Sequence, residues 1–121
     1  NMTLKFTGSY GWIISIERCL TNRTPYRQCY KIDSTSNDLF SVDKRYGFLD
    51  PNEFDMVRLS LNRQRTTPEK LEHFFSFYHK KAEDGFDPEL IWADDPTPEG
   101  VYIQRGLIDL TEEGRVEYED E

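Results

Sequence analysis

The sequence has two cysteines, no long apolar run and few basic residues in its last third. Cys19 and Cys29 stand ten residues apart, a spacing that suits neither a zinc ribbon nor a redox C-x-x-C pair. No apolar stretch approaches the ~20 residues that cross a bilayer, and the chain does not open with a basic region followed by an apolar one. We therefore expect reduced thiols, a cytoplasmic location and no membrane association.

The motifs of common enzyme chemistry are also missing. The sequence holds neither the G-x-S-x-G elbow of serine hydrolases nor a phosphate-binding G-x-x-x-x-G-K-[ST] loop. His73 and His79 lie six residues apart, so in a helix they face different directions and cannot share a metal ion. Adjacent carboxylates such as Asp94 and Asp95 fall in turns, where no apolar pocket raises a pKa for acid catalysis. We expect a protein that is not an enzyme, with no cofactor and no metal.

The 121 residues suffice for one domain, since globular domains cluster at roughly 100–150 residues. Leu, Ile, Val and Phe number 29 of them, which is enough for an apolar core. No repeat, low-complexity tract or Gly/Ser linker interrupts the chain. The sequence therefore predicts a single globular domain over residues 2–118, followed by a frayed acidic tail at 119–121.

Two segments fit both a strand and a helix. In 12–20, Trp12, Ile14 and Ile16 alternate as in a strand, and the isoleucines favour that interpretation, although a helical stripe also fits. In 51–63, a turn followed by alternating apolar residues competes with a helix that begins after Asp50. Both segments are interpreted as strands.

Further strands are predicted at 26–32, 39–42 and 101–110, with a C-terminal hairpin that turns at 111–114 and returns at 115–118. The turn at 21–25 contains Asn22-Arg23-Thr24, which fits a glycosylation acceptor but is interpreted as a turn. If 12–20 and 26–32 form a hairpin, Cys19 lies roughly opposite Cys29, where a disulfide is geometrically possible.

One segment shows a clear helical period. Leu71, Phe74, Phe75 and Tyr78 recur at i, i+3, i+4 and i+7, after a Thr-Pro pair suited to a helix start. This spacing predicts an amphipathic helix at about 68–82. Because strands and helices do not alternate along the chain, we expect an α+β fold, a mostly antiparallel sheet packed on this one main helix with a C-terminal hairpin.

Charge is distributed very unevenly. Residues 1–82 carry a net charge of +4 and residues 83–121 a net charge of −12, which together give the chain its net −8. Such a segment repels nucleic acid and anionic membrane and attracts basic surfaces. Its aromatic residues are interleaved with the acidic ones, a combination typical of protein interfaces. The predicted partner-binding residues are Trp92, Asp94, Asp95, Glu99, Tyr102, Glu112, Glu113, Glu117 and Tyr118, with a core role for Trp92 and Tyr102 as the alternative.

The one basic cluster consists of Arg58, Arg63 and Arg65. Nucleic-acid or nucleotide binding through these residues is the alternative function, but the stretch lacks aromatic platforms for stacking. Internal pairing with the acidic third of the chain is favoured for this cluster.

In its size, acidity and α+β interpretation, the chain resembles the immunity proteins of bacterial competition systems, in particular those of contact-dependent growth inhibition. That resemblance implies a non-catalytic antitoxin that neutralises a cognate basic toxin, such as a nuclease, by covering its surface. No nucleic acid, membrane or cofactor is expected as a partner.

Overall fold

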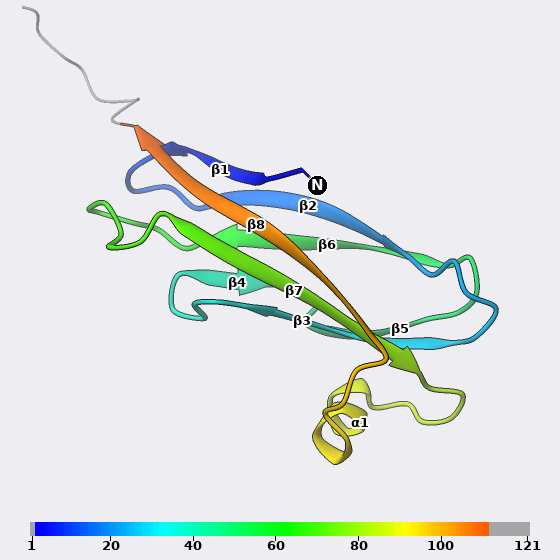
Figure 1. The fold of residues 1–121 in the computed structure, drawn as a ribbon. Helices are drawn as coiled ribbons and strands as arrows, with labels where there is room; N and C mark the ends of the chain where they lie inside the picture. Colours follow the sequence, from blue (N-terminus) through cyan, green and yellow to red (C-terminus); the bar gives the residue numbers. More distant parts are fainter. Residues whose placement is uncertain (1, 112–121) are drawn as a thin grey trace, which may run out of the picture.

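The computed structural model describes residues 2–111, which form two packed β-sheets and one short helix (Figure 1). In chain order the elements are β1 (Leu4–Ser9), β2 (Ile14–Thr21), β3 (Gln28–Ser34), β4 (Phe40–Val42), β5 (Tyr46–Leu49), β6 (Phe54–Leu61), β7 (Glu72–Lys81), α1 (Pro88–Asp94) and β8 (Gly100–Thr111).

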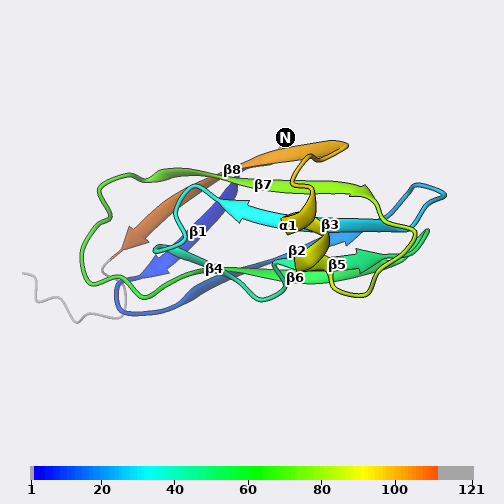
Figure 2. The same ribbon diagram turned by 90° about the horizontal axis from the view of Figure 1, so that it is seen from below.

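The two sheets have different widths. The larger has the strand order β1-β8-β7-β3-β5, and the smaller has the order β2-β6-β4. β1 runs parallel to β8, and the other strand pairs within residues 2–111 are antiparallel. The helix α1 contacts β3 and β5 of the larger sheet, and Figure 2 shows it in front of these strands when the molecule is seen from below.

The core lies between the two sheets. Successive side chains of a strand point to opposite faces, so every second residue enters the interior. In β6 these are Val57, Leu59 and Leu61, all fully buried. Phe40 of the smaller sheet packs edge-on against Phe75 of the larger one, with ring centroids 4.9 Å apart. The two sheets therefore bury each other's apolar faces.

Residues 72–81 form the strand β7, so the predicted helix at 68–82 is wrong. His73, Phe75 and Phe77 point into the sandwich, whereas Leu71 and Phe74 of the expected helical stripe are 46% and 40% exposed. The apparent helical period arises because aromatic residues occupy both faces of the strand. Aromatic side chains are enriched in strands, and β7 lies at the centre of the larger sheet between β8 and β3.

The fold is accordingly mostly β rather than α+β. The seven-residue α1 is the sole helix within residues 2–111, and it covers one end of a sheet rather than forming a layer. Its start is marked by Asp87, whose side chain accepts hydrogen bonds from the backbone of Glu89 (3.1 Å) and Leu90 (3.3 Å). The predicted architecture fails because the second sheet, not a helix, covers the apolar face of the first.

The strand predictions are confirmed in five segments, which contain β2, β3, β4, β6 and β8. The expected pairing of 12–20 with 26–32 is wrong, because β2 pairs with β6 and β3 pairs with β5 and β7 in the other sheet. Cys19 is exposed, Cys29 is buried, and both thiols are free. The return strand of the expected C-terminal hairpin, the predicted domain end at residue 118 and the predicted acidic tail at 119–121 all lie outside the described residues.

Candidate interaction surface

One edge of the larger sheet is only partly covered. β1 pairs with the second half of β8, beginning with Leu4 opposite Gly106. Just before this point, the side chain of Gln104 donates a hydrogen bond to the carbonyl of Met2 (2.7 Å). Within residues 2–111, no strand pairs with Gly100–Ile103 on the side away from β7. We refer to Gly100–Ile103 as the β8 edge.

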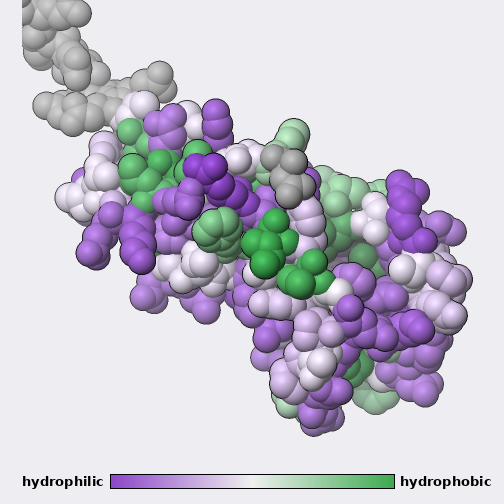
Figure 3. Space-filling model, in the orientation of Figure 1, coloured by the Kyte–Doolittle hydropathy of each residue, from purple (hydrophilic) through white to green (hydrophobic). Residues whose placement is uncertain are grey.

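Apolar side chains surround the β8 edge. Val101 and Ile103 lie on the outer face of the sheet and are 49% and 53% exposed, and Phe74 of the neighbouring β7 lies on the same face. Figure 3 shows apolar side chains grouped over the middle of this face. None of Gly100–Ile103 is charged. Natural sheets usually protect such an edge with charge, proline or a covering segment, so an uncovered apolar edge indicates an interaction site.

A groove of about 410 Å³ opens between the two sheets beside the β8 edge. Its walls come from β2, from the corner between β2 and β3, and from β3, β5, β7 and β8. The main apolar and aromatic wall residues are Leu20, Tyr30, Leu49, Phe77 and Tyr102. No aspartate or glutamate of the described part of the chain lines the groove.

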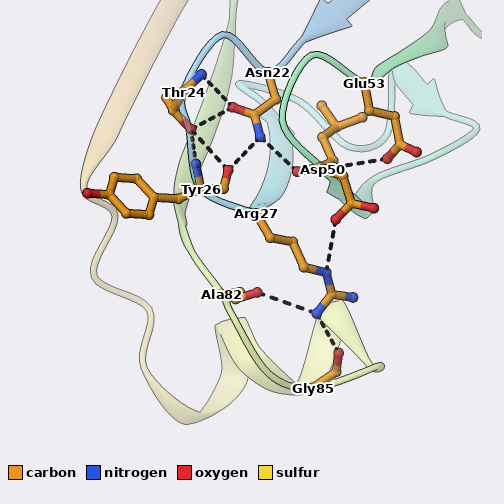
Figure 4. Close-up of polar contacts among 9 residues, drawn as sticks. Asn22, Thr24, Tyr26, Arg27, Asp50, Glu53, Ala82 and Gly85 are labelled. Carbon is orange, nitrogen blue, oxygen red and sulfur yellow. Dashed lines mark hydrogen bonds and ion pairs between the residues drawn. The ribbon is translucent and has the colours of Figure 1, made fainter.

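The buried side chain of Asn22 holds the corner between β2 and β3 at the end of this groove (Figure 4). Its Nδ2 donates to the carbonyls of Tyr26 (2.7 Å) and Leu49 (2.8 Å). Its Oδ1 accepts from the backbone N–H (2.9 Å) and the hydroxyl (2.7 Å) of Thr24. The interpretation of Asn22-Arg23-Thr24 as a turn is therefore confirmed.

Arg27 ties the same corner to the loop that follows β7 (Figure 4). Its Nη1 donates to the carbonyl of Gly85 (2.8 Å), and its Nε lies 3.9 Å from the carboxylate of Asp50. Its guanidinium also stacks 3.7 Å from the ring centroid of Phe48. The groove is thus built on a rigid corner rather than on a free loop.

Most polar side chains that line the groove have partners. Gln28 donates to the Thr24 hydroxyl (3.1 Å) and accepts from His79 Nδ1 (3.2 Å). The Tyr30 hydroxyl donates to Asp55 (3.0 Å), and burial together with this carboxylate raises the pKa of Tyr30 above its ordinary value.

Arg18 is the exception. It shares the inward face of β2 with Ile16 and Leu20, and its buried Nε has no hydrogen-bond partner among the described residues. An arginine N–H removed from water without an acceptor is unfavourable. Arg18 therefore adds to the lining of the groove a cationic side chain that has no ion-pair partner among the described residues.

The structure separates the residues predicted to bind a partner. Trp92 is 3% exposed, and the Nζ of Lys80 lies 4.5 Å from its ring centroid. Trp92 packs in a small core with Cys29, where burial raises the pKa of the Cys29 thiol. Its ring therefore belongs to the interior, the alternative that the sequence left open. Tyr102 is 40% exposed and lines the groove.

Asp94 is exposed at the end of α1, and Asp95 and Glu99 are exposed in the connection between α1 and β8. The Asp95 side chain accepts from the backbone N–H of Thr97 (3.1 Å), which lowers the pKa of that carboxyl. Glu99 accepts from the backbone N–H of Lys81. Asp95 and Glu99 thus hold the local loop. The remaining predicted residues, Glu112, Glu113, Glu117 and Tyr118, lie outside the described residues.

The basic cluster does not pair with the acidic third of the chain within the described residues. Arg58 pairs instead with Glu17 on the neighbouring β2 (3.2 Å), so that expectation is wrong for Arg58. Arg63 and Arg65 are exposed in the loop after β6 and form no ion pair with another described residue.

Sequence reasoning missed Val101, Ile103 and Arg18 as functional candidates. The first two belong to a correctly predicted strand, but only the pairing of β1 with the far half of β8 shows that their edge is uncovered. The one signal for Arg18 was its place in the alternation of β2, where an arginine occupies a position otherwise filled by isoleucine and leucine.

The two sheets and their strand order define an immunoglobulin-like β-sandwich. The MSP (major sperm protein) domain family matches residues 15–95, and the chain therefore belongs to this family. Two uncharacterized proteins of Caenorhabditis elegans are each 34% identical over 89 residues, which is 73% of this chain and 66% and 49% of theirs. The structure of SSP-19, an MSP-domain protein-like family member of the same nematode, superposes with a TM-score of 0.70 at 19% identity, covering 85% of this chain and 92% of that one.

This family membership corrects the functional expectations. The resemblance to immunity proteins of contact-dependent growth inhibition is wrong, and so is the role of an antitoxin that binds a basic toxin or nuclease. The alternative of a nucleic-acid-binding module falls with it. Size and acidity supported the resemblance, but neither is specific to a fold. The described residues contain no helix that is both long and apolar enough to cross a membrane.

Proposed function

We propose that the chain is a non-catalytic protein-interaction domain that binds an extended segment of a partner protein along the β8 edge. The observation that carries this proposal is the uncovered strand Gly100–Ile103, with Val101 and Ile103 exposed beside it. Membership of the MSP family supports it, because MSP domains generally mediate protein interactions. The chain spans 66% and 49% of the lengths of its two nematode relatives, so the proposal concerns this domain alone.

Strand addition follows from the hydrogen-bond pattern of β8. In an antiparallel ladder, alternate residues direct their N–H and C=O groups to the same neighbour. The N–H of Ile108 bonds to the carbonyl of Leu71 before β7 (2.9 Å), so the even-numbered residues of β8 face β7. The odd-numbered Val101 and Ile103 direct their backbone groups to the uncovered side. A partner strand can bond to these groups while its side chains pack on the apolar face.

The proposal includes no catalytic step. Residues 2–111 contain no group of three or more His, Cys, Asp or Glu residues that could hold a metal ion. His73, the buried histidine, uses both ring nitrogens, toward the Thr35 hydroxyl (2.8 Å) and the Lys70 carbonyl (3.1 Å). These contacts give His73 a structural role, since they connect two loops to β7.

Selection of peptides from a random library displayed on phage tests this function. Peptides enriched on the domain are synthesised, and their dissociation constants are measured by fluorescence anisotropy. We expect Ile103→Lys to weaken binding roughly ten-fold or more, because it places a charge in an apolar contact. Phe54→Lys is the matched control, since Phe54 is 60% exposed on β6 of the other sheet. Equal affinities for Ile103→Lys and the unchanged protein, at equal melting temperatures, would contradict the assignment of the β8 edge.

A further inference from the structure

We propose that the groove beside the β8 edge binds an apolar molecule with a single carboxylate, of the size of a medium-chain fatty acid, and that Arg18 holds the carboxylate. This site is distinct from the proposed protein contact on the outer face, and it does not depend on it.

The walls of the groove determine the body of the ligand. Its volume of about 410 Å³ falls in the range of roughly 300–1,000 Å³ that is typical of small-molecule sites. Leu20, Leu49, Tyr30, Phe77 and Tyr102 line it from both sheets. An apolar chain that enters between the sheets replaces water against these side chains.

The polar groups that line the groove determine how many polar groups the ligand carries and where they lie. The buried side chains of Asn22 and Gln28 make the hydrogen bonds described above, and the Tyr30 hydroxyl is bonded to Asp55. None of these groups requires a ligand. The guanidinium of Arg18 can take one, because Arg18 lines the groove and forms no ion pair with another described residue. The ligand therefore needs one acceptor group, placed at Arg18, and no other polar group inside the groove.

The charge of the residues that line the groove favours an anionic acceptor. Among residues 2–111 no carboxylate lines the groove, whereas Arg18 and the exposed Arg23 both do. A guanidinium presents a planar fork of N–H donors that matches one carboxylate. A phosphate group carries more charge and more acceptors than one guanidinium satisfies. A carboxylate on an apolar chain fits both the walls and the donor.

Binding of decanoate, compared with decanol, tests the inference directly on the unaltered protein. Titrations followed by isothermal calorimetry and by NMR should show that decanoate binds roughly ten- to hundred-fold more tightly than decanol, the contribution expected for a charge-assisted hydrogen bond. The methyl signals of Leu20 and Leu49 should shift on binding. Decylamine, which has the opposite charge on the same chain, should bind no better than decanol.

A substitution locates the head group. Arg18→Met keeps an unbranched side chain on β2 and should reduce decanoate affinity to that of decanol, while leaving decanol affinity unchanged. Arg65→Met, which removes an exposed arginine of the loop after β6, is the matched control and should bind as the unaltered protein does. The inference is overturned if decanoate binds no more tightly than decanol, if neither ligand binds, or if Arg18→Met retains the preference for the carboxylate. None of these results would affect the peptide binding proposed for the β8 edge.

Discussion

Replacement of Asn22 by alanine should destabilise the domain strongly, although the residue lies in a turn. The side chain is 5% exposed and makes four hydrogen bonds, two through Nδ2 and two through Oδ1. Each contributes a net stabilisation of about 1 kcal/mol, and a buried group left without a partner costs more, so Asn22→Ala should cost about 3 kcal/mol. That loss is a large fraction of the 5–15 kcal/mol that stabilises a typical domain.

Urea unfolding at equilibrium measures this cost, with the fluorescence of the buried Trp92 as the signal. Asn37→Ala is the control, because Asn37 is exposed and its side chain accepts one bond, from the Ser34 hydroxyl (3.3 Å). We expect the control to lose at most ~0.5 kcal/mol. A loss below ~1 kcal/mol for Asn22→Ala would show that the corner is not held by this side chain, and the rigidity assigned to the groove would be refuted.

Three further predictions concern packing and titration. Gly47→Ala should lower the melting temperature in a thermal scan, because an added Cβ would stand 2.6 Å from the Tyr30 ring; an unchanged value would contradict this packing. Trp92→Ala should lower the free energy of unfolding in urea by about 3–5 kcal/mol. A small loss would contradict the buried position of Trp92. Cys19 should react with a thiol reagent well before Cys29 does. Because burial raises the pKa of Cys29 above 9.0, the stability from its neutral thiol is present below that pH and lost as pH rises through the higher value.

Local alternation predicted much of the fold. Val57, Leu59 and Leu61 alternate with polar residues in the sequence, and the structure buries all three in β6. Alternation failed for β7, because this strand carries aromatic side chains on both faces and so mimics a helical period. The pairing of strands could not be predicted from the sequence, since β2 and β3 are neighbours in the chain but belong to different sheets. No turn motif or spacing between β2 and β3 indicates that the chain passes from one sheet to the other.

The candidate site depends on contacts between distant parts of the chain. Whether Ile103 has a partner strand is decided by where β1 begins, about a hundred residues earlier, as the bond from Gln104 to Met2 illustrates. The charge asymmetry of the sequence predicted that the acidic residues contact a partner. In the described part of the chain, carboxylates such as Asp95 and Glu99 instead accept hydrogen bonds from backbone N–H groups and hold loops. Charge alone does not distinguish a carboxylate that caps a backbone from one that contacts a partner.

Amide hydrogen exchange of Val101 and Ile103, measured by NMR with and without a selected peptide, tests the central claim most directly. If the peptide adds a strand to the β8 edge, the outward-facing N–H groups of both residues become hydrogen-bonded, and their exchange should slow markedly. Amides of β6 in the smaller sheet, such as that of Leu59, provide the internal reference and should not change. If the peptide binds while the exchange of Val101 and Ile103 stays the same and protection appears on another strand, the β8 edge is not the binding site.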